Sequence, residues 1–193
     1  MYKRQAEDDE ILVRGQNIFL GYYKDPAATA ATLNEEGWLH SGDLGAFDDE
    51  GFLKIIGRKK DIIITAGGKN IAPKNIESAL TNLPLVSQAV VIGDRRKFLS
   101  ALITLDPEAA EKWADQNGCS VENIAENPDL NTALMSQIEA QVNSLFARVE
   151  HIRKFTILPR ELDIDNGELT PTLKIKRRIV NQNWESVIDA MYN

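Results

Sequence analysis

The apolar residues of this chain come in short runs, each ended within a few positions by glycine, proline or aspartate. None approaches the roughly 18 apolar residues that a membrane-spanning helix needs, so the pattern excludes a transmembrane protein. The first ten residues are polar and lack the apolar core of a signal peptide. With 43% hydrophobic residues, the sequence predicts a folded protein in the cytoplasm.

Charge and cysteine content argue against a nucleic-acid interface, an internal disulfide and a Cys/His metal site. The chain carries 22 basic and 29 acidic side chains, a net charge of −7, and its basic residues are not interleaved with aromatic ones. Such a chain is a poor match for the phosphate backbone of a nucleic acid, so we expect no nucleic-acid partner. The single cysteine, Cys119, cannot form an internal disulfide, and no Cys/His set has the spacing of metal ligands.

The first 57 residues have the pattern of β-structure interrupted by one helix. Asp25 and Pro26 predict the start of that helix, as N-cap and first helical residue, and Gly37 predicts that it has ended. The other predicted elements are strands at 11–13, 18–20 and 52–56, with a glycine-marked loop and hairpin at 42–51.

The pattern changes after the basic segment 58–60. A β-branched run and two long apolar runs predict strands, and proline-initiated amphipathic segments predict helices between and after them. This order predicts a small α+β domain from about Asp61 onward, with a domain boundary at 57–61. The predicted strands are 61–65, 86–92, 99–105 and 155–158. One predicted helix starts at Pro73, a second starts at Pro107, and two more cover 129–149 and 175–190.

The first stretch that could bind a ligand is GWLHSGDLG, residues 37–45. Asp43 lies between glycines, where a carboxylate can accept two hydrogen bonds from a vicinal diol such as that of ribose. The alternative interpretation is an Asx turn, in which Asp43 caps its own backbone. His40 has no partner that the sequence identifies and is interpreted as a packing or capping histidine.

The second stretch is GRKKD at 57–61, followed by Gly67, Gly68, Lys69 and Asn70. The adjacent cations are typical of a solvated face. Two glycines after a strand permit positive φ angles and close backbone approach, which suits a phosphate or a slender ligand chain. They lack the spacing and ending of a P-loop, and the alternative is an ordinary loop between a strand and a helix.

The third stretch is NGELTPTLKIKRR at 166–178. Thr170 and Pro171 predict a helix start, which would place Lys174 near its first turn. A cation there opposes the helix dipole, so an anionic ligand would account for it. Lys176 and the two arginines that follow are interpreted as a solvated face.

Taken together, these motifs and LVRGQN at 12–17 resemble, in order and spacing, the adenylate-forming superfamily of acyl-CoA synthetases, peptide-synthetase adenylation domains and firefly luciferase. The forms GGKNIAP and TPTLKIKR are most similar to the AMP-forming long-chain fatty acyl-CoA synthetases. The resemblance covers nearly the whole chain but only the back third of the family's usual length. It implies a β-rich end of the large adenylate-binding domain at 1–57, a hinge at 58–61, and at 62–193 the mobile C-terminal domain, with a short mixed or antiparallel sheet flanked by helices.

The resemblance also implies a two-step reaction and a set of site residues. A fatty acid is activated with ATP to acyl-AMP, and the acyl group then passes to coenzyme A. The matched residues are Lys174 as the catalytic lysine between carboxylate and nucleotide; Asp43, Arg58 and Ile55 at the nucleotide; Lys60 at the hinge; and Gly67, Gly68 and Lys69 in the loop that lines the coenzyme A tunnel.

The chain departs from the family in two ways. Leu173 stands where most relatives have glycine before the catalytic lysine. The phosphate loop and the fatty-acid tunnel lie upstream in relatives, so Mg²⁺-ATP would be bound mainly there, in an N-terminal domain that is the expected partner. We therefore expect the 193-residue chain alone to be inactive. The resemblance also allows peripheral membrane association and a homodimer.

Two other classes of function remain open at this stage. One is a fatty acyl-AMP ligase, which passes its product to a carrier protein, or another acid-activating enzyme of the superfamily. The other is a non-catalytic module that binds a nucleotide or coenzyme A. The presence of Lys60 and Lys174 argues against such a module, which has no need of them.

Overall fold

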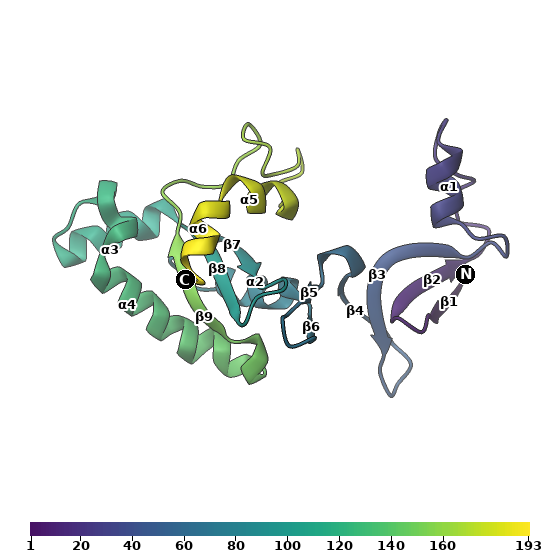
Figure 1. Ribbon diagram of the computed structural model, residues 1–193, viewed down its shortest axis with the longest axis horizontal. Helices are drawn as coiled ribbons and strands as arrows, with labels where there is room; N and C mark the ends of the chain where they lie inside the picture. Colours follow the sequence, from purple (N-terminus) through teal and green to yellow (C-terminus); the bar gives the residue numbers. More distant parts are fainter. The chain divides into compact units, whose positions relative to one another are not determined.

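The computed structural model describes residues 1–193, which divide into two compact units (Figure 1). The N-terminal unit is Met1–Ile62 and the C-terminal unit is Ile63–Asn193. The division follows one residue after the segment 58–61 that the sequence analysis treats as a hinge.

The N-terminal unit is a four-stranded antiparallel sheet with one short helix, and its strands follow the chain order β1-β2-β3-β4. The predicted helix start is confirmed, because the Asp25 side chain accepts a hydrogen bond of 2.9 Å from the Ala28 N–H and Pro26 is the first helical residue. The elements are β1 Tyr2–Gln5, β2 Glu10–Arg14, α1 Pro26–Thr32, β3 Leu39–Phe47 and β4 Leu53–Arg58.

Two predictions for this unit are wrong. Residues 18–20 form bends and not a strand. The loop expected at Gly42 and Gly45 is instead the middle of the long strand β3. Gly45 is needed for close packing within the sheet and not for a turn, because a Cβ there would lie 2.6 Å from Ile11 Cδ1 and 2.7 Å from the Lys54 carbonyl oxygen.

The core of the N-terminal unit is thin. Its buried apolar side chains are Ile11, Leu12 and Trp38, and the guanidinium groups of Arg4 and Arg14 lie over the Trp38 ring at 4.3 and 4.7 Å. Many other large apolar side chains of this unit are exposed: Met1, Tyr2, Phe19, Leu20, Tyr22, Tyr23, Phe47, Phe52, Ile55 and Ile56.

The C-terminal unit is built on a mixed three-stranded sheet of order β7-β8-β9, which confirms the predicted α+β class. Strands β7 and β8 are antiparallel, and β8 and β9 are parallel. A separate two-stranded hairpin precedes this sheet. The strands are β5 Ile63–Ile64, β6 Asn70–Ile71, β7 Val86–Ile92, β8 Leu99–Leu105 and β9 Ile152–Ile157.

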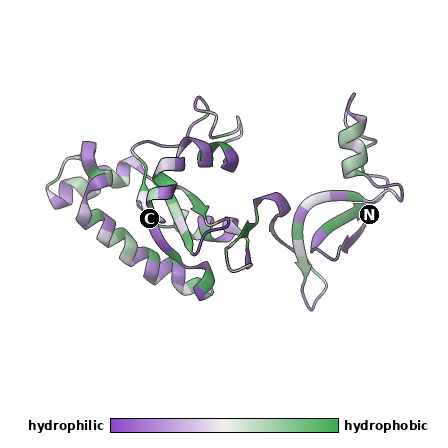
Figure 2. Cartoon of the chain, viewed as in Figure 1, coloured by the Kyte–Doolittle hydropathy of each residue, from purple (hydrophilic) through white to green (hydrophobic).

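Helices cover both faces of this sheet. Alternate residues of a strand point to opposite faces, so Val91 packs into one apolar core with α2, α3 and α4, while its neighbour Val90 packs into a second core with α5 and α6. Figure 2 shows that the strands of this sheet are largely hydrophobic, whereas α5 and α6 are mainly hydrophilic in this view. The helices are α2 Pro73–Thr81, α3 Pro107–Asn117, α4 Pro128–Gln137, α5 Arg177–Asn183 and α6 Glu185–Ala190.

The single helix predicted over 129–149 is wrong in its second half. After α4 the chain forms a π-helical segment at Ile138–Val142 and then a 3₁₀ turn. The cause is Asn143, a buried side chain that accepts from the Ile152 N–H at 2.8 Å and donates to the Ile152 carbonyl at 3.1 Å. These bonds turn the chain into β9, which begins three residues earlier than predicted.

Two further boundaries differ from the sequence prediction. The strand expected over 61–65 is only β5, because Lys59–Asp61 forms a 3₁₀ turn. The terminal helix begins at Arg177 and not at 175, and it breaks at Trp184 into α5 and α6. None of the helices is both long enough and apolar enough to cross a membrane.

Candidate functional site

Asp43 and Arg58 are direct neighbours across strands β3 and β4 of the N-terminal unit. Arg58 Nε lies 3.4 Å from Asp43 Oδ1, with 59% of the arginine side chain and 36% of the aspartate side chain exposed. The Asx-turn interpretation of Asp43 is wrong, because the residue lies inside a strand and its carboxylate pairs with Arg58. Ile55 is exposed on the same strand as Arg58. A carboxylate and a guanidinium thus face solvent side by side.

A buried carboxylate, Glu10, bonds to the chain neighbours of this pair. Sequence reasoning missed this residue. Only 5% of its side chain is exposed. It accepts hydrogen bonds from the Gly42 N–H at 2.8 Å and from Lys59 Nζ at 3.1 Å, and His40 Nδ1 lies 3.1 Å away. Gly42 precedes Asp43 and Lys59 follows Arg58, so Glu10 holds the neighbours of both residues.

Burial alone would raise the pKa of Glu10, but the hydrogen bonds from His40, Gly42 and Lys59 outweigh it and lower the pKa below its usual value. Lys59 also lies 2.6 Å from Asp8, so it is not part of a purely solvated face. The next residue, Lys60, is exposed in the 3₁₀ turn at the end of the N-terminal unit.

In the C-terminal unit, Lys174 lies on a tight hairpin that precedes helix α5. The Lys176 N–H donates to the Glu168 carbonyl at 2.7 Å, and the Thr170 N–H donates to the Lys174 carbonyl at 2.8 Å. Lys174 is exposed and takes part in none of the ion pairs of the chain. The helix start predicted at Thr170 and Pro171 is wrong, since these residues form the turn of the hairpin. We call residues 168–176 the lysine hairpin.

Leu173, where the resemblance leads us to expect glycine, lies in a turn whose backbone favours glycine. Leu173 has a φ of +59°, in the left-handed region where glycine is favoured, and 70% of its surface is exposed. A leucine there costs roughly 1–2 kcal/mol relative to the right-handed conformation. A glycine at this position would adopt the same turn without that strain.

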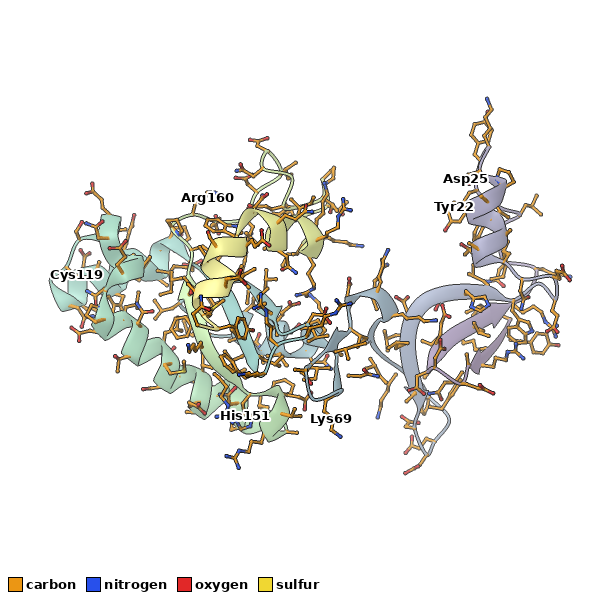
Figure 3. The ribbon with its side chains drawn as sticks, viewed as in Figure 1. Tyr22, Asp25, Lys69, Cys119, His151 and Arg160 are labelled. Carbon is orange, nitrogen blue, oxygen red and sulfur yellow. The ribbon has the colours of Figure 1, made fainter.

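Two ion pairs, each with a buried carboxylate, hold the two ends of the lysine hairpin: one is made by Glu168, its first residue, and the other by Arg177, the residue that directly follows it. The Glu168 side chain is 0% exposed and accepts two bonds from Arg160, at 2.7 and 2.9 Å, and one from Trp184 Nε1 at 2.9 Å. Arg160 also lies over the Trp184 ring, and Figure 3 shows it beside the α5–α6 region (Figure 3). Burial alone would raise the pKa of Glu168, but the bonds from Arg160, Asn183 and Trp184 outweigh it and lower the pKa to about 2.

Arg177, directly after the lysine hairpin, holds its second end. The interpretation of Arg177 as part of a solvated face is wrong. Its Nη1 donates to the Val91 carbonyl at 2.7 Å, and its Nη2 lies 2.5 Å from Glu77 Oε1. Glu77 is itself buried and accepts from the Val91 N–H at 2.9 Å. Lys176 and Arg178 are exposed, as expected.

The two glycines of the second stretch lie in the turn between β5 and β6, not in a loop between a strand and a helix. The Thr65 N–H donates to the Lys69 carbonyl at 3.1 Å and closes the turn. Gly68 has a φ of +73°, which accounts for that glycine, whereas a Cβ on Gly67 would meet only Thr65 Oγ1, at 3.9 Å. Lys69 is exposed on this hairpin (Figure 3).

The structure therefore brings some predicted site residues together and leaves others on separate segments. Asp43 and Arg58 meet in the N-terminal unit, while Lys174 and the turn containing Gly67 belong to two different hairpins of the C-terminal unit. A cavity of about 610 Å³ in the C-terminal unit, lined by residues of α4, β9 and the end of α6, contains none of these residues. No group of three or more His, Cys, Asp or Glu side chains could hold a metal ion.

Residues 60–193 match the family model described as "AMP-binding enzyme C-terminal domain". The chain therefore belongs to this family, and the family inferred from the motifs is confirmed. The match begins inside the segment 58–61, three residues before the C-terminal unit.

Relatives with curated names agree with this result. The long-chain-fatty-acid–CoA ligase FadD15 of Mycobacterium tuberculosis is 49% identical over 194 residues, which cover 98% of this chain and 32% of the ligase. The long-chain-fatty-acid–CoA ligase ACSBG1 of Rattus norvegicus is 39% identical over 203 residues, covering 95% of this chain and 28% of the ligase. The chain thus spans about a third of the length of the curated relatives it matches.

Solved structures agree on the fold. The A domain of a carboxylic acid reductase from Segniliparus rugosus, in complex with AMP and a co-purified carboxylic acid, has a TM-score of 0.80 and 27% identity. The match covers 95% of this chain and 28% of that one. A second carboxylate reductase adenylation domain, from Mycobacterium chelonae, has a TM-score of 0.77, 27% identity and the same coverage of this chain, and the match covers 27% of its own length.

Proposed function

We propose that this chain is the C-terminal portion of an AMP-forming long-chain fatty acid–CoA ligase. The observation that carries the proposal is the lysine hairpin, which presents the exposed, unpaired Lys174 and is held at its ends by two ion pairs with buried carboxylates. The curated names of the relatives support the same assignment. The whole protein would activate a fatty acid with ATP and transfer it to coenzyme A.

In the first step, a carboxylate oxygen of the fatty acid attacks the α-phosphorus of ATP, and pyrophosphate leaves with the bonding electrons. Both reactants are anions, so they repel each other until a cation lies between them. Lys174 would supply that cation, and its charge would stabilise the oxygens on which negative charge gathers in the transition state. Its exposure and its lack of an ion pair leave the ammonium group free for this role.

The pair Asp43–Arg58 would hold the sugar of the nucleotide. A carboxylate can accept hydrogen bonds from both hydroxyls of a ribose, and the neighbouring guanidinium can donate to the sugar oxygens. The existing contact between the two side chains is a single exposed ion pair of 3.4 Å, which costs little to rearrange. Ile55, exposed on the same strand, would lie near the nucleotide.

Adenylation would be tested first in the full-length protein, with a long-chain fatty acid, ATP and coenzyme A. We expect AMP, pyrophosphate and acyl-CoA, and we expect the 193-residue chain alone to form no acyl-adenylate. Acyl-adenylate without acyl-CoA would instead indicate a fatty acyl-AMP ligase. Nucleotide binding without either product would indicate a binding module, and both outcomes would contradict the proposal.

Replacing Asp43 is expected to weaken ATP use in that assay. Asp43→Ala removes hydrogen bonds to a charged acceptor, worth roughly 1.5–3 kcal/mol, so kcat/KM for ATP should fall by about 10- to 100-fold. The matched control is Asp49→Ala, which removes the same charge from an exposed position in the β3–β4 turn. Equal effects of the two substitutions would argue against a ribose contact at Asp43.

In the second step, the sulfur of coenzyme A attacks the acyl carbonyl carbon, the thiol proton is lost, and AMP leaves. The turn at Gly67, Gly68 and Lys69 would line the path of the pantetheine arm. Gly67 supports this role because neither its φ nor a neighbouring atom of the chain requires a glycine there. A thin ligand that passes close to the backbone would require one.

Gly67→Ala is therefore expected to separate stability from activity. In the 193-residue chain, the free energy of unfolding should stay the same or rise by up to about 1 kcal/mol, because alanine restricts the conformations of the unfolded chain. The Tm should therefore not fall. The rate of acyl-CoA formation from supplied acyl-adenylate should fall about tenfold or more in the full-length protein. Gly118→Ala is the control, since it strains a left-handed residue far along the chain and should lower Tm while sparing that rate. An unchanged rate in Gly67→Ala would remove this turn from the coenzyme A path.

The division of the chain supports a proposal for the domains. Residues 1–57 would be the end of the large adenylate-binding domain, and their exposed apolar side chains would pack against the rest of it. Residues 58–61, with Lys60, would be the hinge, and 62–193 the mobile domain. The chain brings together no ligand set for Mg²⁺, which would be held elsewhere in the protein. A cytoplasmic location, contact with a membrane surface and a homodimer belong to the same proposal.

A further inference from the structure

We propose that Glu168 and Arg177 are positioning residues for Lys174: their ion pairs, each with a buried carboxylate, fix the first residue of the lysine hairpin and the residue that directly follows it, and thereby the place of the catalytic ammonium group. This inference rests on the proposed role of Lys174 in adenylation. It concerns residues that touch neither the nucleotide nor the acid, and whose effect reaches the reaction only through the hairpin.

The hairpin needs outside anchors because its own bonds are all local. Its arms pair at the isolated bridge between Leu169 and Ile175, with backbone bonds from the Lys176 N–H to the Glu168 carbonyl and from the Thr170 N–H to the Lys174 carbonyl. Within the turn, the Leu173 N–H donates to the Thr170 carbonyl and the Lys174 N–H to Thr170 Oγ1. A lone two-stranded hairpin is at best marginally stable in water. The direction in which it presents Lys174 must therefore be set where it joins the rest of the unit.

The first anchor ties the hairpin to the junction of α5 and α6. Glu168 accepts two bonds from Arg160 and others from Asn183 and from the Trp184 indole. A buried ion pair usually contributes no more stability than apolar side chains of similar volume, because both charges lose their water. What the ion pair of Glu168 provides is a fixed direction, because several hydrogen bonds hold its carboxylate in one place. Apolar packing would not fix the direction in this way.

The second anchor connects Arg177, directly after the hairpin, to the edge of the sheet. Arg177 donates to the Val91 carbonyl and to Glu77, while Glu77 accepts from the Val91 N–H. Val91 belongs to β7, which is an edge strand. The guanidinium thus uses two nitrogens in a fixed fork, which the single ammonium group of a lysine cannot reproduce.

Lys174 lies between these anchors, three residues before Arg177 and six after Glu168. Each anchor pairs a buried carboxylate, Glu168 or Glu77, with a partly exposed arginine, so breaking either pair would free one end of the hairpin to tilt. A misplacement of a reacting group by about 1 Å can cost on the order of 100-fold in rate. Weakening either anchor should consequently impair the step that needs Lys174 and spare the step that does not.

The test uses Arg177→Lys, which keeps the charge and removes the fork, and Glu168→Gln, which keeps the shape and removes the charge. Two rates are measured in the full-length protein: fatty-acid-dependent ATP–pyrophosphate exchange, and acyl-CoA formation from supplied acyl-adenylate. We expect exchange to fall by about 10- to 100-fold and acyl-CoA formation to change less than twofold. In the 193-residue chain, amide exchange at Lys174 and Lys176 should accelerate, while amides of β8 stay protected.

The control is Asn143→Ala, which breaks the buried bonds to Ile152 in the same unit but touches neither anchor. It should lower Tm and leave the ratio of the two rates unchanged. If Glu168→Gln does not fold, Arg177→Lys and the amide exchange still decide the question. The inference is overturned if Lys174→Ala selectively loses pyrophosphate exchange but Arg177→Lys keeps it within twofold, or loses both rates equally. If Lys174→Ala keeps full exchange, the proposed role of Lys174 fails, and the inference fails with it.

Discussion

Lys174→Ala in the full-length protein is expected to lower fatty-acid-dependent ATP–pyrophosphate exchange by about 100- to 1,000-fold, the range seen when one charge-stabilising group is removed from an active site. Acyl-CoA formation from supplied acyl-adenylate should change little, because the thiol attacks an uncharged acyl carbonyl in that step and not a phosphate of ATP. The two half-reactions are followed by isotope exchange and by thioester formation. The selectivity of the loss, more than its size, identifies the role of the lysine.

The chain offers a matched control for this substitution. Lys176 is exposed on the same hairpin, two residues further on, and Lys176→Ala removes the same charge while keeping the backbone bond to Glu168. It should leave both half-reactions within about twofold of the unchanged protein. A similar loss in both lysine variants, or an equal loss of both half-reactions in Lys174→Ala, would contradict the assignment.

Acid is expected to destabilise the C-terminal unit through Glu168. The pKa of this carboxyl is about 2 in the folded chain against 4.5 as its ordinary value, so the unfolded chain binds a proton first as the pH falls. Its contribution is therefore complete above about pH 4.5 and is lost as the pH falls toward 2. The shift corresponds to about 3 kcal/mol of unfolding free energy.

Urea unfolding of the 193-residue chain at a series of pH values between 6 and about 2.5, followed by circular dichroism, measures this loss. The comparison is with Glu168→Gln, which cannot titrate at this position. The variant should be less stable near neutral pH and should have a flatter dependence on pH between about 4.5 and 2.5. Parallel pH profiles of the two proteins would show that the acid sensitivity arises at other carboxylates.

Sequence reasoning succeeded where the signal is local. The starts of α1 and α3 follow from an aspartate N-cap followed by proline, and the end of α3 follows from Gly118 in the left-handed conformation. It failed where a distant residue decides. The bonds between Asn143 and Ile152 end a helix that the apolar pattern alone would continue, and Gly45 was mistaken for a loop residue because its close neighbours come from two other strands.

The same distinction applies to the candidate site. The motifs named Asp43 and Arg58, and the structure pairs them across two strands. They gave no sign of Glu10, whose partner Lys59 is 49 residues away, or of the bond between Arg177 and Val91, which are 86 residues apart. A cation within a run of cations resembles a solvated one in sequence. Only the fold distinguishes the half-buried, paired Arg177 from the exposed Lys176 and Arg178.

The two apolar cores of the C-terminal unit share the backbone of β7 and β8, since neighbouring residues such as Val90 and Val91 belong to different cores. If either core loses its packing, β7 and β8 lose support on one face, and this in turn weakens the other core. The unit should therefore lose its order in a single cooperative event, in which α4 and α5 report the same transition although they lie on opposite faces of the sheet. The N-terminal unit has no such doubled core, and its few buried side chains make it the part of the chain that opens first.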